Sequence, residues 1–263
     1  MEKITSLQNL RIKNIVKLAK AKERRSQGLF IIEGARELSL ALMAGYKLDS
    51  VFICPELFEK TDYPDVLNSI EQDKIYEVSE AVFEKIAYRE GSDGLLALAK
   101  PRKHGLENLE LSANPFVIVL EAVEKPGNLG AILRTADAAQ VDAVIICDPA
   151  TDLYNPNVIR SGVGCLFTVQ TAVCGSEEAF AYLQKNNIRT FAAELTASNW
   201  YQDTDFAKPS AIIMGTEADG LTDFWLSSAD ARIKIPMRGK IDSLNVSVST
   251  AVLTFEAMRQ RGF

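Results

Sequence analysis

The segment IKIPMRGKIDSLNVSVSTAVLTFEA, residues 233–257, carries the most information about the fold. Its first residues predict a short strand that ends at Pro236, because proline cannot donate to a strand ladder. A loop follows, and a long helix is predicted at about 244–260, opened by Ser243, Leu244 and Asn245. One apolar face of this helix would consist of Val248, Val252 and Phe255. Small polar residues crowd its first turns beyond what capping needs, which favours a ligand pocket, with tight helix packing as the alternative.

Strand-like apolar runs occur throughout the second half of the chain. FVIVLE at 116–121 is apolar up to its last residue, which is typical of a strand buried on both faces of a parallel sheet. The other runs are AVIIC (143–147), RTFAAEL (189–195), SAIIM (210–214) and ARIKIP (231–236). Helical patterns lie between them at about 128–140, 157–165 and 176–187. This alternation predicts an α/β domain with a doubly wound, mostly parallel sheet.

A first polar motif lies in EKPGNLGAILRTADA, residues 124–138. Asn128 is well suited to cap the helix that follows. The buried face of that helix would consist of Leu129, Ile132, Leu133 and Ala136. Arg134 lies about 140° from this face on the helical wheel. It can therefore point into a cleft at the carboxyl ends of the strands, although an ordinary surface arginine is the competing explanation.

A second polar motif lies in IIMGTEADGL, residues 212–221. The predicted strand runs into Gly215, where the missing side chain would let a ligand approach the backbone closely. Glu217 follows in the turn and would serve either a ligand site or the dipole of the next helix.

Together, the three segments resemble the SpoU (TrmH-type) branch of the SPOUT RNA methyltransferases. The matching patterns are N-x-x-x-x-x-R after the first strand, G-x-E-x-x-G after a later strand, and I-P-M-x-G-x-x-x-S-L-N-V-S at the end. Their order and spacing agree over residues 116–261. The resemblance implies methylation of a ribose 2′-hydroxyl in RNA with S-adenosylmethionine as cofactor. It also implies a trefoil knot in the C-terminal domain and a homodimer whose sites take groups from both chains.

The resemblance further implies roles for eight residues. The cofactor contacts would be Gly215, Ile235 and Leu244. Catalysis or assembly of the site would involve Asn128, Arg134, Glu217, Ser243 and Asn245. Thr216 and Ala218 depart from the family pattern, which has Asn or Ser and Gly at these places in many members. Because a guanidinium stays protonated in proteins, we expect Arg134 to position the nucleotide and stabilise the developing alkoxide rather than act as a base.

The N-terminal segment is basic, whereas the chain as a whole has a net charge of −6. Residues 1–28 contain eight basic and two acidic side chains, a net charge of +6. Residues 5–26 predict one helix with an apolar face of Ile12, Ile15, Val16 and Ala19. Its cations recur at helical spacing at Lys13, Lys17, Lys20 and Arg24. This basic stripe is either a contact with the RNA backbone or an ordinary solvated face.

The rest of the first half predicts a small α/β unit. FIIEG (30–34), ARELSLALMAG (35–45) and LDSVFIC (48–54) form a βαβ-like pattern, and residues 56–98 continue the alternation. The polar stretch PRKHGLENLELSANP holds two prolines and is typical of a linker. We therefore predict an RNA substrate-binding domain at 1–103, a linker at 104–115 and a methyltransferase domain at 116–263.

Residues 30–53 also resemble the small N-terminal substrate-binding domain of this family. That likeness implies large-subunit (23S) ribosomal RNA as the substrate, because the members that act on transfer RNA often lack the domain. A transfer-RNA 2′-O-methyltransferase remains an alternative. A second alternative is a non-catalytic RNA-binding or assembly factor that retains the fold. No DNA partner is expected.

Composition narrows the remaining classes of protein. The four cysteines have no C-x-x-C spacing and there is a single histidine, so no metal site is predicted. Cys54 and Cys147 each end an apolar run and are expected to be buried. No glycine-rich nucleotide fingerprint follows the first strand of the second half. Without a membrane-spanning run or a secretory signal pattern, we expect a cytoplasmic protein.

Overall fold

A computed structural model describes residues 2–58, 63–89 and 91–262. Its contacts divide the chain into two compact units. The first contains Met1–Lys103 and Asp152–Phe167, and the second contains His104–Thr151 and Thr168–Phe263. Residues 152–167, which lie inside the predicted methyltransferase domain, therefore group with the N-terminal residues. The bounds of the two functional domains stay a prediction.

The second unit is built on a seven-stranded sheet in the order β10-β12-β9-β11-β6-β7-β8. All of its strand pairings are parallel. The strands are β6 (Phe116–Glu121), β7 (Ala143–Cys147), β8 (Thr171–Cys174), β9 (Arg189–Ala193), β10 (Asn199–Trp200), β11 (Ser210–Met214) and β12 (Ala231–Lys234). The predicted α/β class and parallel sheet are thus confirmed, while β8 and β10 were not predicted.

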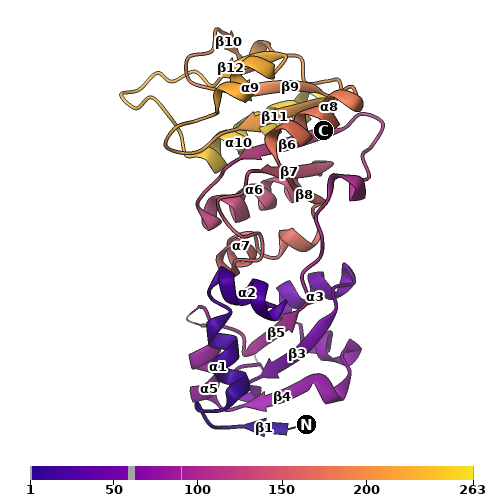
Figure 1. Ribbon diagram of the computed structural model, residues 1–263, viewed down its shortest axis with the longest axis vertical. Coiled ribbons are helices and arrows are strands. Elements are labelled where there is room, and N and C mark those ends of the chain that lie inside the picture. Colours follow the sequence, from indigo (N-terminus) through magenta and orange to yellow (C-terminus); the bar gives the residue numbers. More distant parts are fainter. Residues whose placement is uncertain (1, 59–62, 90, 263) are drawn as a thin grey trace. The chain divides into compact units, whose positions relative to one another are not determined.

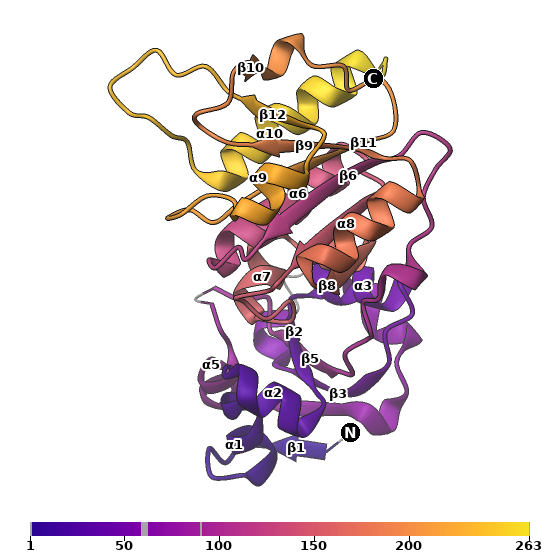
Figure 2. The same ribbon diagram turned by 45° about the horizontal axis from the view of Figure 1, so that its top comes forward.

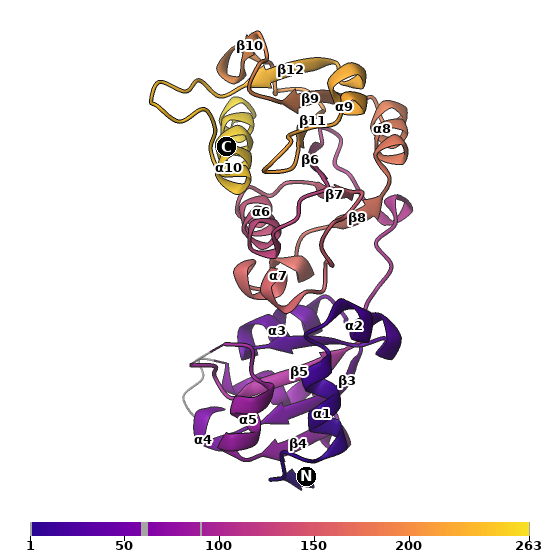
Figure 3. The same ribbon diagram turned by 60° about the vertical axis from the view of Figure 1, so that its left-hand side comes forward.

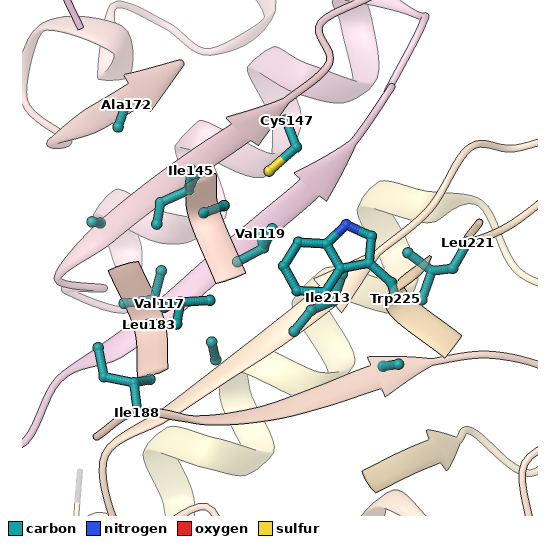
Figure 4. Packing of buried hydrophobic residues seen from close by; sticks show 14 residues of the cluster. Val117, Val119, Ile145, Cys147, Ala172, Leu183, Ile188, Ile213, Leu221 and Trp225 are labelled. Atoms are coloured by element: carbon teal, nitrogen blue, oxygen red, sulfur yellow. The ribbon is translucent and has the colours of Figure 1, made fainter. Parts of the chain in front are cut away.

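Helices cover both faces of this sheet (Figures 1 and 3). In these views α6 (Pro126–Ala138) and α10 (Val246–Gln260) lie on one face, and α8 (Ser176–Lys185) and α9 (Asp223–Ser228) on the other. Alternate residues of the strands and the inner sides of α8 and α9 form one buried cluster, with Trp225 fully enclosed (Figure 4). This packing is the two-sided burial that the apolar strands predicted.

The apolar face predicted for the last helix is not the side that packs on the sheet. The residues of α10 that are buried are Val246, Thr250, Leu253, Thr254, Ala257 and Met258. Val248 and Phe255 instead remain 48% and 42% exposed. Both sides of this helix carry apolar residues, so periodicity alone does not choose the side that packs on the sheet.

The first unit has a mixed five-stranded sheet in the order β1-β4-β3-β5-β2 (Figures 1 and 2). The strands are β1 (Glu2–Ile4), β2 (Phe30–Glu33), β3 (Leu48–Ile53), β4 (Ile75–Val78) and β5 (Leu95–Ala99). The helices are α1 (Leu10–Lys17), α2 (Ala21–Gln27), α3 (Ala35–Met43), α4 (Pro55–Phe58), α5 (Glu80–Ile86) and α7 (Pro156–Ser161). Because β5 pairs antiparallel with both β2 and β3, it separates the two strands of the βαβ-like pattern.

Short 3₁₀ turns complete both units. They are η1 (Pro64–Ser69), η2 (Gln72–Lys74), η3 (Leu106–Asn108), η4 (Cys165–Phe167) and η5 (Tyr201–Asp203). Cys54 and Cys147 are buried as predicted. Within the described ranges, no helix combines the length and apolar character that a membrane span needs.

The single N-terminal helix predicted at 5–26 is wrong, because the structure breaks it into α1 and α2. Arg24 is 5% exposed, and its guanidinium donates to the carbonyl oxygens of Leu18 at 2.7 Å and Ala19 at 3.0 Å. It also pairs with Asp152 at 2.7 Å. Arg24 thus satisfies the carbonyls at the end of α1 and cannot belong to an exposed basic stripe.

The buried side of this N-terminal region also differs from the prediction. Ile12, Ile15 and Leu18 are buried, whereas Val16 and Ala19 are exposed. The helix α1 ends at Lys17, so Ala19 no longer follows the wheel of a single helix, and within α1 only Ile12 and Ile15 of the predicted face are buried.

Candidate active site

A cleft of about 630 Å³ opens at the carboxyl ends of the parallel strands of the second unit. The residues after β9, β11 and β12 and the start of α10 line it, among them Glu194, Gly215, Ile235 and Leu253. Ligands gather at this edge of open α/β sheets, and the volume is in the range of small-molecule and cofactor sites.

The loop after β11, residues 215–221, lines the cleft along its whole length, and we refer to it as the cleft loop. Thr216 and Gly220 exchange backbone hydrogen bonds of 2.9 and 3.2 Å, which folds the loop back on itself. A side chain at Gly215 would collide with the backbone of Gly220. Gly215 is therefore required by the turn of its own loop, a reason other than the close ligand approach that the sequence suggested.

Three predicted residues from distant segments meet beside this loop. Asn128 Nδ2 donates to the Glu217 carboxylate. Asn245 Nδ2 donates to Asn128 Oδ1 at 3.1 Å. The three polar motifs are thus joined in one chain of hydrogen bonds, although 117 positions separate Asn128 from Asn245.

The side-chain role expected of Asn128 in capping is wrong. The helix α6 begins with Lys125 at its N-cap and Pro126 in its first turn, so Asn128 lies inside the first turn. Its amide is consequently free to connect Glu217 and Asn245. The predicted buried face of α6, formed by Leu129, Ile132, Leu133 and Ala136, is confirmed.

Asn245 both caps α10 and takes part in the site. Its side-chain oxygen accepts from the Ser247 backbone N–H at 2.9 Å and from the Ser247 hydroxyl at 2.6 Å. The same side chain donates to Asn128, so the cap fixes the amide that bridges to α6. Ser243 lines the cleft and donates to Asp242 at 3.2 Å.

Arg134 is not brought into the cleft of its own chain. It is exposed on α6 and is not among the residues that line the cleft. Arg134 follows Asn128 by six positions on α6. It therefore lies about 9 Å further along the helix axis, and its side chain points about a third of a turn away from that of Asn128. No hydrogen bond or ion pair joins the Arg134 side chain to any residue in the part of the chain that the structure describes.

The remaining predicted residues line the cleft together. Gly215, Ile235 and Leu244, the three expected cofactor contacts, are all in its wall, and so are Glu217, Ser243 and Asn245. Only Asn128 and Arg134 are outside the wall, and Asn128 bonds two of its members. Their functional roles stay a prediction.

Several charged residues of the cleft were not predicted from the sequence. Its wall includes the carboxylates of Glu194, Asp219 and Asp242 and the ammonium groups of Lys125 and Lys234. Glu194 follows β9 directly, so the rule that ligands bind at the carboxyl ends of strands was a signal that could have identified it. Among the described residues, no group of three or more His, Cys, Asp or Glu side chains could hold a metal ion.

Comparisons with known proteins agree in both units. The model of the "SpoU rRNA Methylase family" matches residues 115–255, and an "MRM3-like substrate binding domain" matches residues 9–97. The 23S rRNA (guanosine(2553)-2′-O)-methyltransferase RlmP of Bacillus subtilis is 28% identical over 255 residues, which cover 97% of this chain and 98% of that protein.

Two solved structures are similar over almost the whole chain. A crystal structure of an RNA 2′-O ribose methyltransferase is 39% identical with a TM-score of 0.86, covering 99% of this chain and 100% of that one. The AdoMet-bound rRNA methyltransferase from Sinorhizobium meliloti is 28% identical with a TM-score of 0.88, covering 98% and 97% of the two chains.

Proposed function

The chain belongs to the SpoU rRNA methylase family, and from this premise we propose that it methylates a ribose 2′-hydroxyl of RNA with S-adenosylmethionine. The observation that carries the proposal is the hydrogen-bonded chain Asn245–Asn128–Glu217 beside the cleft at the carboxyl ends of the strands. A similar protein, the Sinorhizobium meliloti rRNA methyltransferase, was solved with AdoMet bound.

The residues of the cleft fit this cofactor. Met214, Leu226 and Leu253 offer an apolar wall for a purine, and the backbone of the cleft loop supplies donors and acceptors beside it. The carboxylates of Glu194, Glu217, Asp219 and Asp242 suit a ligand that carries a cationic sulfonium. We place the cofactor contacts at Gly215, Ile235 and Leu244.

In the proposed reaction the cofactor would supply an electrophilic methyl group and leave as a thioether. The protein aligns the 2′-hydroxyl, whose proton passes to a neighbouring RNA phosphate or to water. Asn128 connects the cleft loop to the start of α10 through hydrogen bonds with Glu217 and Asn245. These bonds hold the two sides of the site at a fixed position relative to each other. Ser243 shapes the same wall. Arg134 stays protonated, so its role is to hold the nucleotide and stabilise the alkoxide that develops.

We also propose that the protein acts as a homodimer with the trefoil knot of its family. Because Arg134 is exposed and is not in the cleft of its own chain, the Arg134 side chain of one protomer would serve the cleft of the other. The exposed apolar residues of α10, Val248 and Phe255, support a covering partner surface.

Complementation tests this arrangement. Mixed Arg134→Ala and Asn128→Asp proteins should regain activity after refolding together, since a mixed dimer contains one intact site. Lack of recovery despite a dimeric mass would place Arg134 and Asn128 in the same site of one chain.

Substrate selection is proposed to reside in the first unit. The match to a substrate-binding domain over residues 9–97 and the basic residues of the N-terminal segment support RNA contact there. This domain, and the likeness to a 23S rRNA methyltransferase over nearly the whole chain, favour large-subunit ribosomal RNA over transfer RNA. With its bacterial relatives, we place the protein in the cytoplasm.

The deciding experiment offers labelled S-adenosylmethionine with unmodified ribosomal RNA and with transfer RNA, followed by mapping of alkali-resistant linkages. We expect label in large-subunit ribosomal RNA at a 2′-O-methyl position. Label in transfer RNA alone would replace the substrate assignment. Cofactor binding without transfer to either RNA would favour a non-catalytic RNA-binding factor.

A further inference from the structure

We propose that Glu121 is a positioning residue for methyl transfer, because its carboxylate holds the exit of the cleft loop in place. The inference rests on the proposed function of the cleft. Glu121 is the last residue of β6 and is only 3% exposed. No ion pair links it to a cation in the described ranges of the chain. A buried carboxylate in this situation needs hydrogen-bond donors.

Thr222 supplies the two closest donors. Its backbone N–H lies 2.8 Å from one carboxylate oxygen of Glu121, and its hydroxyl lies 2.7 Å from the other. The Ser176 hydroxyl is more distant, at 3.4 Å. Thr222 directly follows the cleft loop, so the Glu121 carboxylate fixes the point where that loop ends.

The other end of the cleft loop is held by the same strand. Met214, the last residue of β11, pairs with Leu120 of β6. Both ends of the loop are therefore attached to consecutive residues of β6. Glu217 in the loop bonds Asn128, which follows β6 seven positions after Glu121. Glu121 thus determines where Glu217 lies relative to Asn128.

The Thr222 hydroxyl bonds Glu121 instead of capping the helix that follows. We call the two hydrogen bonds between Thr222 and Glu121 a tether. Thr222 occupies the N-cap of α9, where a threonine hydroxyl commonly accepts from the first turn, yet it makes no side-chain cap. The helix is anchored instead from its buried side. The indole N–H of Trp225 donates to Ser176 at 3.0 Å, and the Ser176 hydroxyl donates to Asp148 at 2.7 Å.

A second pair of hydrogen bonds between a carboxylate and a threonine, which we also call a tether, lies at the other end of the strands of the same sheet. Asp230 accepts from the backbone N–H and the hydroxyl of Thr190, both at 2.8 Å. Thr190 lies near the beginning of β9 and Asp230 precedes β12, so this tether is at the amino ends of the strands. Neither residue lines the cleft. The Asp230→Asn variant therefore controls for loss of a carboxylate–threonine tether as such.

The experiment measures S-adenosylmethionine binding by calorimetry and thermal unfolding for wild type, Glu121→Gln and Asp230→Asn. A glutamine places an amide donor against the donors of Thr222, and one of them loses its acceptor. We expect Glu121→Gln to bind the cofactor roughly tenfold more weakly and to raise its KM. Asp230→Asn should lower the unfolding temperature while its cofactor affinity stays within about twofold of wild type.

Variants of Thr222 keep the test decisive if Glu121→Gln folds poorly. Thr222→Val removes only the hydroxyl and should weaken cofactor binding. Thr222→Ser keeps the hydroxyl and should bind the cofactor as tightly as the wild type. In the Glu121→Gln background, adding Thr222→Val should weaken cofactor binding little further, since the tether is already lost.

The outcomes separate this inference from the proposed function. Undiminished cofactor affinity of both Glu121→Gln and Thr222→Val would overturn the role of Glu121 alone. An equal loss of affinity in Asp230→Asn would overturn it too, because the effect would then be general destabilisation. A wild-type protein that binds no S-adenosylmethionine would overturn the proposed function together with the inference.

Discussion

Arg24 in the first unit and Arg134 in the second are both arginines on helices, yet their surroundings are opposite. Arg24 is buried, pairs with Asp152 and donates to the carbonyl oxygens at the end of α1. Arg134 is exposed on α6, and its side chain bonds to no residue in the described part of its chain. The sequence predicted that both side chains would point outward from their helices.

The difference separates charges that serve folding from charges available to a ligand. A buried arginine whose donors are satisfied stabilises the chain and has none left for RNA. An exposed arginine whose side chain has no partner in its own chain retains its donors for a phosphate or a developing oxyanion. Burial and partners, rather than residue type or helical spacing, therefore decide which charges act on substrate.

The largest effect is expected for Arg134→Ala. Methyl transfer should fall by about a hundredfold to a thousandfold, because an electrostatic contact to the transition state is lost. Cofactor affinity and thermal stability should stay unchanged, since Arg134 is exposed and does not line the cleft of its own chain. Single-turnover methylation and calorimetry measure both quantities.

Lys185→Ala is the control for Arg134→Ala, because it removes an exposed cation from α8 on the other face of the same sheet. It should methylate at the wild-type rate. Near-normal turnover of Arg134→Ala would remove Arg134 from the proposed mechanism and erase its contrast with Arg24.

Arg24→Met should act on folding. Removing the guanidinium leaves Asp152 and the carbonyls of Leu18 and Ala19 without their donor, which should cost about 3 kcal/mol of unfolding free energy. Urea unfolding measures the change, with the exposed neighbour Arg25→Met as the control. If both variants unfold alike and Arg24→Met loses RNA affinity, Arg24 belongs with the substrate contacts after all.

Asn128→Asp tests the convergence of the three motifs. The change is isosteric and places a second carboxylate against Glu217, where the Asn128 amide now donates. We expect a loss of about tenfold to a hundredfold in kcat/KM. Asn128→Ala should lose less, because it removes the bridge without adding repulsion. An equal loss in both variants would show that only the bridge matters, and a smaller loss in Asn128→Asp would contradict the hydrogen-bonded chain.

The same contrast shows what the sequence could predict. Long apolar runs such as FVIVLE identified β6, β7 and β11 at their observed bounds, because burial on both faces leaves an unbroken signal. The strand β8 has four residues and β10 only two, and α9 has six, too few for a period to stand out.

For the site, the sequence identified the residues but not all of their roles. Motif order named Asn128, Glu217 and Asn245, which the fold brings into one hydrogen-bonded chain. The cap expected of Asn128 failed because α6 already begins at Pro126. The free surface expected of Arg24 failed because its partner Asp152 is distant in sequence, and local patterns carry no record of such partners.

A smaller effect is expected for the cations of α1 and its end. Reversing Lys13, Lys17 and Lys20 to Glu should weaken RNA binding roughly tenfold at low salt, because all three are exposed. If each contacts one phosphate, the slope of log affinity against log salt should flatten by about 2. Filter binding across a salt series measures it. An unchanged slope would show that these lysines do not contact RNA and form an ordinary solvated face.

The smallest effect is expected for Glu37→Gln, which asks whether a buried charge of the first unit serves folding as Arg24 does. Glu37 is 4% exposed in α3, and burial raises the pKa of its carboxyl above the ordinary value, with Arg89 partly opposing the shift. The folded chain therefore holds this proton at pH values where the unfolded chain has released it. Unfolding releases the proton in that window, so the wild type loses stability as pH rises through it.

The Glu37→Gln variant has no proton to lose at this position, so its stability should not contain this dependence. Urea unfolding from about pH 4 to about pH 8 should show the wild type falling relative to the variant as pH increases. The exposed Glu84→Gln on α5 controls for loss of one negative charge and should follow the wild type. Parallel curves for all three proteins would mean that Glu37 titrates alike in both states. Glu37 would then not be a buried charge that opposes folding of the first unit.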